Sequence, residues 1–175
     1  MLIVSPGCCG RNTSVLSSMR AYQDRFYYLL MDETDIVTGR HLKKIPKAVA
    51  EICEGLKKKP SVVMICITCV DALLGTDMER VCHKAEEYAG VPVRPCYMYA
   101  LTREGRKPPM VHVRQSVYSL LEPKKKKGNV VNLLGYFSPL TDDCELYDLL
   151  HGAGVKTIHE ISRCKDYAQY QTMSE

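Results

Sequence analysis

The sequence contains no tryptophan and only two phenylalanines among its 175 residues. Aromatic side chains are the platforms on which single-stranded nucleic acids stack, and the 11 tyrosines are scattered along the chain rather than grouped. A net charge of +4 is mild for this length, and the two lysine runs, at residues 57–59 and 124–127, are short enough to lie in solvated loops. Neither feature indicates a nucleic-acid partner.

Long apolar runs are also missing. No run approaches the roughly 20 apolar residues that a membrane helix needs. The apolar opening, residues 1–4, is followed at once by Ser5, Pro6 and Gly7, and it is far too short for the core of a signal peptide. We therefore expect no membrane partner and a location in the reducing cytoplasm.

Motifs that hold phosphate groups are absent as well. The chain has neither a Gly-x-Gly-x-x-Gly sequence nor a P-loop, whose glycines let backbone N–H groups approach the phosphates. A nucleotide- or small-ligand-binding α/β domain with merely buried cysteines is therefore disfavoured.

Cysteine, by contrast, is abundant. Nine cysteines are many for a cytosolic chain of this length, and an odd number argues against a closed disulfide framework. The functional alternatives are thiolate chemistry and metal ligation. The plainer alternative is that the cysteines are small buried residues, since free cysteine is among the most buried residue types.

The order of the apolar segments predicts the fold class. Short β-branched runs alternate with longer segments of helical period, which is typical of a parallel sheet covered by helices. The predicted strands are residues 2–4, 62–67, 91–94, 130–134 and 155–158. The predicted helices are residues 14–30, 42–56, 77–89, 111–121 and about 142–151, with a short polar helix near Tyr167. We expect an α/β fold with a Rossmann-like parallel sheet flanked by helices.

Two cysteines directly follow predicted strands. Cys9 lies in the loop after the first strand, and Cys69 follows the strand at residues 62–67. In an open parallel sheet, ligands gather at the carboxyl ends of the strands, so the two thiols approach each other if these strands are neighbours. Glycines around Cys9 let the backbone approach a cluster and offer N–H groups to its sulfurs. The sequence therefore predicts an iron-sulfur site that contains Cys9 and Cys69.

The remaining cysteines show no paired motif beyond one Cys-x-x-Cys, formed by Cys66 and Cys69. A thioredoxin-like motif opens a helix with both thiols in the first turn, whereas Cys66 lies inside an apolar run. A zinc site would need a second Cys or His pair, which is missing. We interpret five cysteines as structural residues: Cys53, Cys82, Cys96, Cys144 and Cys164.

Other chemical groups are secondary candidates. Asp71 and Asp77 lie close to Cys69 in the sequence and could exchange protons or ligate a cluster. Acidic residues are also favoured at helix N-termini, and we interpret Asp77 as a helix cap. Arg11, Arg103 and Arg106 could stabilise an anionic cluster, although exposed arginine is common. The five histidines show no metal-ligand spacing: His41, His83, His112, His151 and His159.

Residues 68–79, Thr-Cys-Val-Asp-Ala-Leu-Leu-Gly-Thr-Asp-Met-Glu, are the most specific of several blocks that match a known family in the right order. The other blocks are residues 5–9 (Ser-Pro-Gly-Cys-Cys), 33–39 (Glu-Thr-Asp-Ile-Val-Thr-Gly), 90–93 and 132–136. On these blocks the chain resembles the nitrogenase component 1 type oxidoreductases. That family includes molybdenum-iron protein subunits, cofactor-assembly scaffolds and tetrapyrrole reductases. The resemblance covers only the N-terminal portion of a family member.

The resemblance implies roles for particular cysteines. The position of Cys69 is a cluster ligand in the family. Residues 5–9 look like the family's His-Gly-Pro-x-Gly-Cys loop, but the histidine and one glycine are replaced, which leaves Cys8 as a rival of Cys9 for the second position.

The resemblance also implies how the cluster is completed. In this family a [4Fe-4S] or P-cluster-like centre lies between two subunits that both contribute cysteines. A third cysteine, usual upstream of the first strand, has no counterpart here. A cubane cluster needs four thiolates, and two copies of Cys9 and Cys69 in a symmetric dimer would supply them. We expect a second subunit, identical or different, as partner.

Two functions follow from the resemblance. The first is an oxidoreductase component that relays electrons from an ATP-dependent iron-protein reductase. The alternative is a non-catalytic scaffold for metallocofactor assembly. The family's large catalytic cofactor is bound by later domains, so the sequence leaves open whether the protein is an enzyme.

The basic segment between Pro123 and Gly128 predicts the domain organisation. We expect a cluster-binding α/β domain at residues 1–123, a basic linker at 124–128 and the start of a second Rossmann-like unit at 129–175. Because two strands alone rarely form a stable sheet, we interpret the second unit as a truncated domain.

Overall fold

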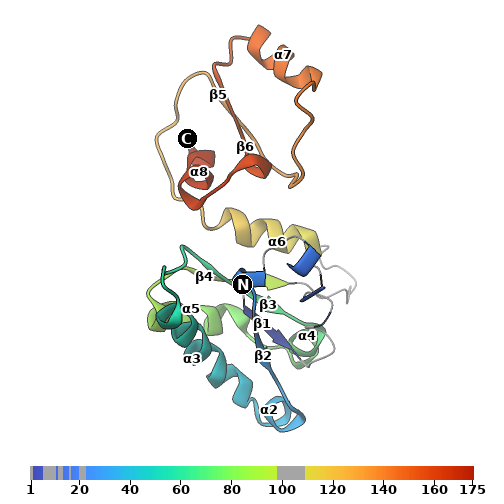
Figure 1. The fold of residues 1–175 in the computed structure, drawn as a ribbon, viewed down its shortest axis with the longest axis vertical. Coiled ribbons are helices and arrows are strands. Elements are labelled where there is room, and N and C mark those ends of the chain that lie inside the picture. Colours follow the sequence, from blue (N-terminus) through green and yellow to red (C-terminus); the bar gives the residue numbers. More distant parts are fainter. Residues whose placement is uncertain (1, 6–10, 12–13, 16, 20–22, 98–108) are drawn as a thin grey trace. The chain divides into compact units, whose positions relative to one another are not determined.

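The structure is a computed structural model that describes residues 2–5, 11, 14–15, 17–19, 23–97 and 109–175. The chain divides into two compact units, Met1–Val117 and Tyr118–Glu175. Both contain parallel strands and helices (Figure 1), which confirms the predicted α/β class. None of the described helices is long and apolar enough to cross a membrane.

The first unit contains a four-stranded parallel sheet in the order β2-β1-β3-β4. The strands are β1 (Leu2–Ser5), β2 (Tyr27–Leu30), β3 (Val63–Ile67) and β4 (Val93–Tyr97). All three pairings are parallel, and β1 lies between β2 and β3. The sheet therefore has one carboxyl edge, at which all its strands end.

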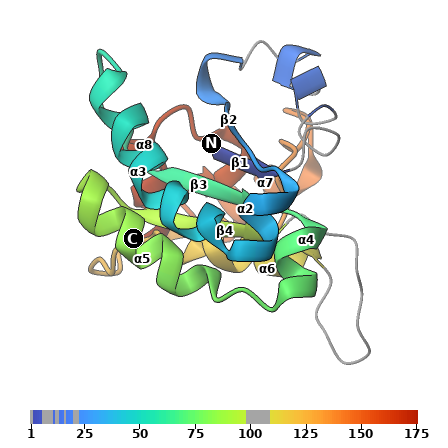
Figure 2. The ribbon, with the colours of Figure 1, turned by 90° about the horizontal axis from the view of Figure 1, so that it is seen from below.

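The helices that accompany this sheet include α2 (Glu33–Thr38), α3 (Arg40–Gly55), α4 (Cys69–Leu74), α5 (Met78–Ala89) and α6 (Pro109–Tyr118). Helices α3 and α5 run side by side (Figures 1 and 2) and form the core against one face of the sheet. Ile45 and Val49 from α3, Ala85 from α5 and Ile65 from β3 are fully buried there. Burial stabilises the fold by about 1.5–3 kcal/mol per large aliphatic side chain.

One predicted helix is wrong in its second half. Residues 11, 14–15 and 17–19 are helical, but the prediction of a helix over residues 14–30 misses a short 3-10 helix, Gln23–Arg25, and the strand β2. The run from Tyr27 to Leu30 alternates between half-buried and exposed side chains, as a strand with one covered face does. Its pairing with β1 decides the outcome, because tertiary pairing overrides a weak local preference.

The second unit has its own two-stranded parallel sheet, formed by β5 (Val130–Leu133) and β6 (Thr157–Glu160). Its helices are α7 (Glu145–Gly152), η2 (Ile161–Arg163), α8 (Tyr167–Gln171) and η3 (Thr172–Ser174). β6 starts two residues later than the strand predicted at residues 155–158. α7 starts three residues later than the helix predicted at about residues 142–151.

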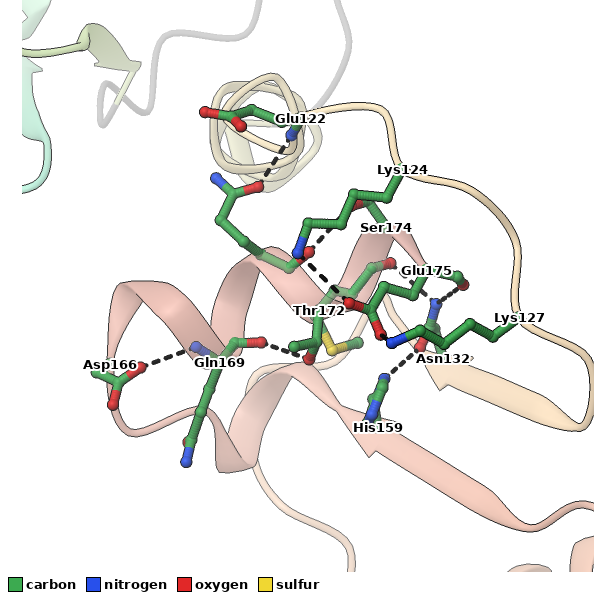
Figure 3. Close-up of polar contacts among 12 residues, drawn as sticks. Glu122, Lys124, Lys127, Asn132, His159, Asp166, Gln169, Thr172, Ser174 and Glu175 are labelled. Atoms are coloured by element: carbon green, nitrogen blue, oxygen red, sulfur yellow. Dashed lines mark hydrogen bonds and ion pairs between the residues drawn. The ribbon is translucent and has the colours of Figure 1, made fainter.

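A polar network ties the last residues of the second unit to its sheet (Figure 3). Asn132 on β5 and His159 on β6 are register partners, and His159 Nδ1 lies 3.0 Å from Asn132 Oδ1. The Asn132 amide donates to the carbonyl oxygens of Met173 and Glu175 at 3.0 and 3.1 Å. The Glu175 carboxylate in turn accepts from Lys124 and Lys127, two members of the basic segment.

Candidate functional site

The carboxyl edge of the first sheet has the strand order that the predicted site requires. β1 and β3 are parallel neighbours, with Leu2 opposite Ile65 and Ile3 opposite Cys66. The carboxyl ends of β1, at Ser5, and of β3, at Ile67, therefore lie at the same edge of the sheet. Cys8 and Cys9 lie in that loop, outside the described residues, so their part in the site stays a prediction.

Cys69 is the first residue of α4 and is partly exposed. Thr68 occupies the cap position in an extended conformation, which turns the chain from β3 into the helix. The helix has six residues and stops at Gly75, whose φ of 65° is the left-handed conformation that glycine adopts without strain. The sequence thus places one thiol where a parallel sheet binds ligands.

Asp71, two residues after Cys69, is buried against His41 from the first turn of α3. His41 Nε2 lies 3.3 Å from Asp71 Oδ1, and each side chain is only 1% exposed. Burial raises the pKa of Asp71, while the charge and the hydrogen-bonding contact of His41 oppose that rise. Asp71 is therefore more than a solvated helix-terminal acid.

A second contact fixes the orientation of the His41 ring. Its Nδ1 lies 3.0 Å from the backbone oxygen of Asp35. A carbonyl oxygen only accepts, so Nδ1 carries a hydrogen and Nε2 is the atom that faces Asp71. The ring thus joins the first turn of α2 to the first turn of α4.

Asp35, which orients the His41 ring, is itself fixed by a hydrogen bond and by ion pairs. Its backbone N–H donates to Asp32 Oδ1 at 2.7 Å, and its carboxylate lies 2.6 Å from Lys44 Nζ and 3.9 Å from Arg40 Nε. The hydrogen bond from Lys44 holds the pKa of Asp35 below its usual value. The block at residues 33–39 is thus the anchor of His41.

Sequence reasoning missed His41, because the histidines show no ligand spacing. The contact with Asp71 joins residues 30 positions apart, which no local pattern reveals. A usable signal did exist, since His41 directly follows the block at residues 33–39 and Asp71 lies inside the block at residues 68–79.

Asp77 is a helix cap, as predicted. Its Oδ1 accepts the backbone N–H of Arg80 at 3.1 Å at the start of α5. Gly90 ends the helix in the left-handed conformation, which confirms the predicted stop.

Cys66 does not share a helix turn with Cys69. It lies in β3 opposite Cys96 of β4, and the two buried thiols are hydrogen-bonded to each other. The hydrogen bond with Cys96 and burial together raise the pKa of Cys66. The Cys-x-x-Cys sequence therefore lacks the geometry of a thioredoxin motif.

Two further cysteines are core residues, as expected. Cys53 on α3 and Cys82 on α5 are buried in the apolar core, and burial raises the pKa of Cys82 to about 12. Cys144 and Cys164 in the second unit are partly exposed.

Among the described residues, no contact joins the other secondary candidates to Cys69. Arg11 is exposed, whereas Arg103 and Arg106 lie outside the described residues. Four histidines have contacts elsewhere: His83 with Glu87, His112 with Tyr97, His151 with Val155 and His159 with Asn132. In the part of the chain that the structure describes, no three His, Cys, Asp or Glu side chains are grouped for a metal ion.

One thiolate ligand fits an iron-sulfur cluster within the described residues. Cys69 is partly exposed at the carboxyl edge, and the hydroxyl oxygen of neighbouring Thr68 is buried without a hydrogen-bond partner among the described residues. A large open hollow of about 900 Å³ lies elsewhere, along α5 and the first residues of β4, and none of the candidate ligands lines it.

Exposed apolar side chains accompany Cys69 at the carboxyl edge. Leu73 and Leu74 lie on α4, Leu30 ends β2, and Val37 lies on α2 with 85% of its surface exposed. Helices α2 and α4 follow β2 and β3, so these side chains belong to the same edge. Exposed apolar side chains that adjoin one another mark interaction surfaces more often than isolated ones do, and Leu73 and Leu74 are neighbours in the chain.

Comparison with known proteins finds similar sequences among two kinds of nitrogenase-related proteins. The nitrogenase iron-molybdenum cofactor biosynthesis protein NifE of Rhizobium meliloti (strain 1021) is 32% identical over 127 residues, covering 71% of this chain and 26% of that protein. NifE of Rhodobacter capsulatus is 28% identical over 176 residues, covering 96% of this chain and 36% of that protein. The nitrogenase molybdenum-iron protein alpha chain of Methanosarcina barkeri is 42% identical over 65 residues, covering 37% of this chain and 12% of that protein.

The solved structure titled "Nitrogenase Cp1 at pH 6.5" has the same fold. It aligns with a TM-score of 0.66 at 20% identity, covering 98% of this chain and 35% of that one. The chain spans about a quarter to a third of the length of the NifE proteins above. The family model described as nitrogenase component 1 type oxidoreductase matches residues 1–175, and the chain belongs to that family.

Proposed function

We propose that this chain binds an iron-sulfur cluster at the carboxyl edge of its first sheet and shares it with a second subunit. Cys69 is one ligand, and Cys9 is the other from this chain, with Cys8 as its rival. The observation that supports the proposal is the parallel pairing of β1 with β3, because the two strands that precede these cysteines in the sequence are neighbours. The cluster is a [4Fe-4S] or P-cluster-like centre.

The cluster needs a second subunit on chemical grounds. Four thiolates hold a cubane cluster, and the proposed pair supplies half of them. Leu73 and Leu74, which follow Cys69 on α4, and Val37 on α2 are exposed and suit a surface that a partner covers. An identical or a different partner would each complete the ligand set.

The role that we favour is a scaffold for metallocofactor assembly. Most of this chain is similar to proteins named for the biosynthesis of the iron-molybdenum cofactor. In that role the chain's residues bind a cluster and hold it for transfer, and no substrate site is needed in these 175 residues. The proposal includes a cluster-binding domain at residues 1–123, a linker at 124–128 and a second unit at 129–175. It also places the protein in the cytoplasm, where thiols stay reduced.

Electron relay from an ATP-dependent iron-protein reductase is the second candidate. The similarity of 65 residues to a nitrogenase molybdenum-iron protein alpha chain favours it. A relay would use the same cysteines, but its cluster would change oxidation state when the reductase hydrolyses ATP.

Metal analysis of anaerobically purified protein tests the cluster. Iron, acid-labile sulfide and the electron paramagnetic resonance spectrum would be measured for the wild type and for Cys69→Ser, Cys9→Ser and Cys8→Ser. We expect Cys69→Ser and one of the two loop variants to lose most of the iron. Cys53→Ser, at a core cysteine of α3, is the control that should retain it. An iron-free wild-type protein after reconstitution would contradict the proposal.

A second measurement separates the two roles. The reconstituted protein would be mixed with an iron-protein reductase, with or without ATP, and the cluster absorbance followed. ATP-dependent bleaching supports the relay. A cluster that stays oxidised but moves to an apo-acceptor supports the scaffold.

A further inference from the structure

Helix α4 begins without the side-chain cap that normally holds a helix start. Thr68 occupies the cap position, but its hydroxyl makes no capping bond and has no hydrogen-bond partner among the described residues. By contrast, the caps of α2 and α5, Asp32 and Asp77, both accept a backbone N–H. A helix of six residues is barely stable by itself, so the missing capping bond leaves its first turn dependent on other contacts.

The side chain that anchors this turn is Asp71. It points into the protein against His41, with neither group exposed to water. The closest side-chain partner of the Asp71 carboxylate is His41, at 3.3 Å, and its further polar contacts are with backbone N–H groups of its own turn, at Thr68 and Asp71. Because an unpaired buried carboxylate is costly, the pair resists separation.

His41 can act as an anchor because it is itself immobilised. Its other ring nitrogen is bonded to the Asp35 backbone, and the Asp35 carboxylate is bonded to Lys44. A continuous set of contacts thus runs from α2 through His41 to Asp71, and Asp71 shares a single helix turn with Cys69.

We propose that His41 is a positioning residue for Cys69, acting through Asp71. The ring fixes the first turn of α4 and so fixes the direction and exposure of the Cys69 thiol. This inference deepens the proposed function, on which it rests for the identity of the bound group. The orientation of the Cys69 thiol in the cluster-free chain does not depend on which group is bound.

Two substitutions of His41 separate its two contacts. In His41→Asn the side-chain amide nitrogen replaces Nδ1 and keeps the bond to the Asp35 backbone, but it cannot reach Asp71. In His41→Gln the amide nitrogen lies near the position of Nε2 and keeps the contact with Asp71. Both variants are polar and smaller than histidine. Asparagine lacks one methylene that glutamine keeps, so the free energy of unfolding of both variants is measured as well, to separate lost packing from the lost contact.

The first readout is the alkylation rate of Cys69 in cluster-free, reduced protein, measured by peptide mass spectrometry with N-ethylmaleimide. Cys144 in the second unit, also partly exposed, is the internal control. We expect a change on the order of tenfold at Cys69 in His41→Asn and less than about twofold in His41→Gln, with Cys144 unchanged. Equal rates at Cys69 in the two variants would overturn the proposal, whether both match the wild type or both differ from it.

A double substitution checks that the effect passes through Asp71. Asp71→Ala should change the Cys69 rate as His41→Asn does, and the two together should have no larger effect than either alone. Additive effects would contradict a path through Asp71. A further readout applies if the wild type binds iron. His41→Asn should then alter the electron paramagnetic resonance spectrum of the cluster, and His41→Gln should preserve it. An iron-free wild type would refute the proposed cluster but leave the alkylation result valid.

Discussion

Two buried carboxylates follow or end parallel strands of this molecule, and their surroundings differ. Glu160, the last residue of β6, accepts hydrogen bonds from the backbone of Leu140 at 2.8 Å, from the Tyr147 hydroxyl at 2.6 Å, from Arg163 Nε at 2.9 Å and from Ser162. Asp71, after β3, has one side-chain partner, His41, among the described residues, and otherwise faces only backbone groups of its own turn. Burial opposes ionisation of both groups.

The pKa values record this difference. Burial works to raise the pKa of Glu160, but the hydrogen bonds from Ser162, Tyr147 and Leu140 outweigh it and bring the pKa to about 2. For Asp71 burial is the larger effect, and its pKa is raised. A fully hydrogen-bonded carboxylate stabilises the second unit, whereas an incompletely satisfied one lies at the edge that carries the candidate ligand.

The two units also differ in what holds them together. The first has an apolar core between α3, α5 and the sheet, while the second has few buried apolar side chains and relies on Glu160 and the Asn132 network. We therefore expect substitutions in the two units to affect stability differently: loss of apolar burial should dominate in the first unit, and loss of hydrogen bonds in the second.

The largest effect is expected from Ile45→Ala in the first unit. Ile45 is fully buried, and removing three carbons leaves a cavity that costs about 2–5 kcal/mol of the free energy of unfolding. Denaturant titration would measure it. Val37→Ala, at an exposed residue of α2, is the control, and we expect a change below about 0.5 kcal/mol. Similar losses in both variants would refute an apolar core as the main support.

The second prediction concerns acid and Glu160. Because its pKa is lower in the folded state than the ordinary 4.5, its contribution is complete above that value and is lost as the pH falls towards about 2. The lowering of the pKa from 4.5 to about 2 corresponds to a contribution of about 3 kcal/mol to the free energy of unfolding. Hydrogen exchange at the Leu140 amide, measured at several pH values, would follow the loss in the second unit.

Glu160→Gln should remove most of this pH dependence, and the exposed Glu145→Gln should leave it unchanged. A wild-type second unit equally stable at pH 5 and pH 2.5 would show that the hydrogen bonds do not hold Glu160 ionised.

The third prediction compares two exposed leucines. Leu73 at the carboxyl edge is 67% exposed, and Leu149 on α7 is 62% exposed. If a partner covers the edge, Leu73→Glu should weaken subunit association on the order of tenfold, because a charge would enter an apolar interface. Sedimentation of reconstituted protein would measure it, with Leu149→Glu as the matched control. Equal weakening by both would argue against a specific interface at α4.

The smallest effect contrasts two helix starts. Asp77→Ala removes a capping bond of α5 and should lower the free energy of unfolding by about 1 kcal/mol. Thr68→Ala removes a hydroxyl that caps nothing among the described residues, and its cost should be less than half as large. Thermal unfolding of the two variants would show the difference. A larger loss for Thr68→Ala would reveal a role for its hydroxyl.

The sequence by itself determined the features that depend on neighbouring residues. Apolar runs predicted the strand at Val63–Ile67, and Asp77 and Gly90 predicted both ends of α5, because capping and left-handed turns are local. The position of Cys69 at a strand end followed from the same local reasoning.

Only the tertiary structure decided the features that depend on distant segments. Strand β2 forms because β1 lies beside it, although its residues continue a predicted helix. His41 and Asp71 are 30 residues apart, and the donors to Glu160 come from positions 140, 147, 162 and 163. Burial decides whether such groups are partners or surface residues, and burial is a property of the packed chain, which no single segment carries.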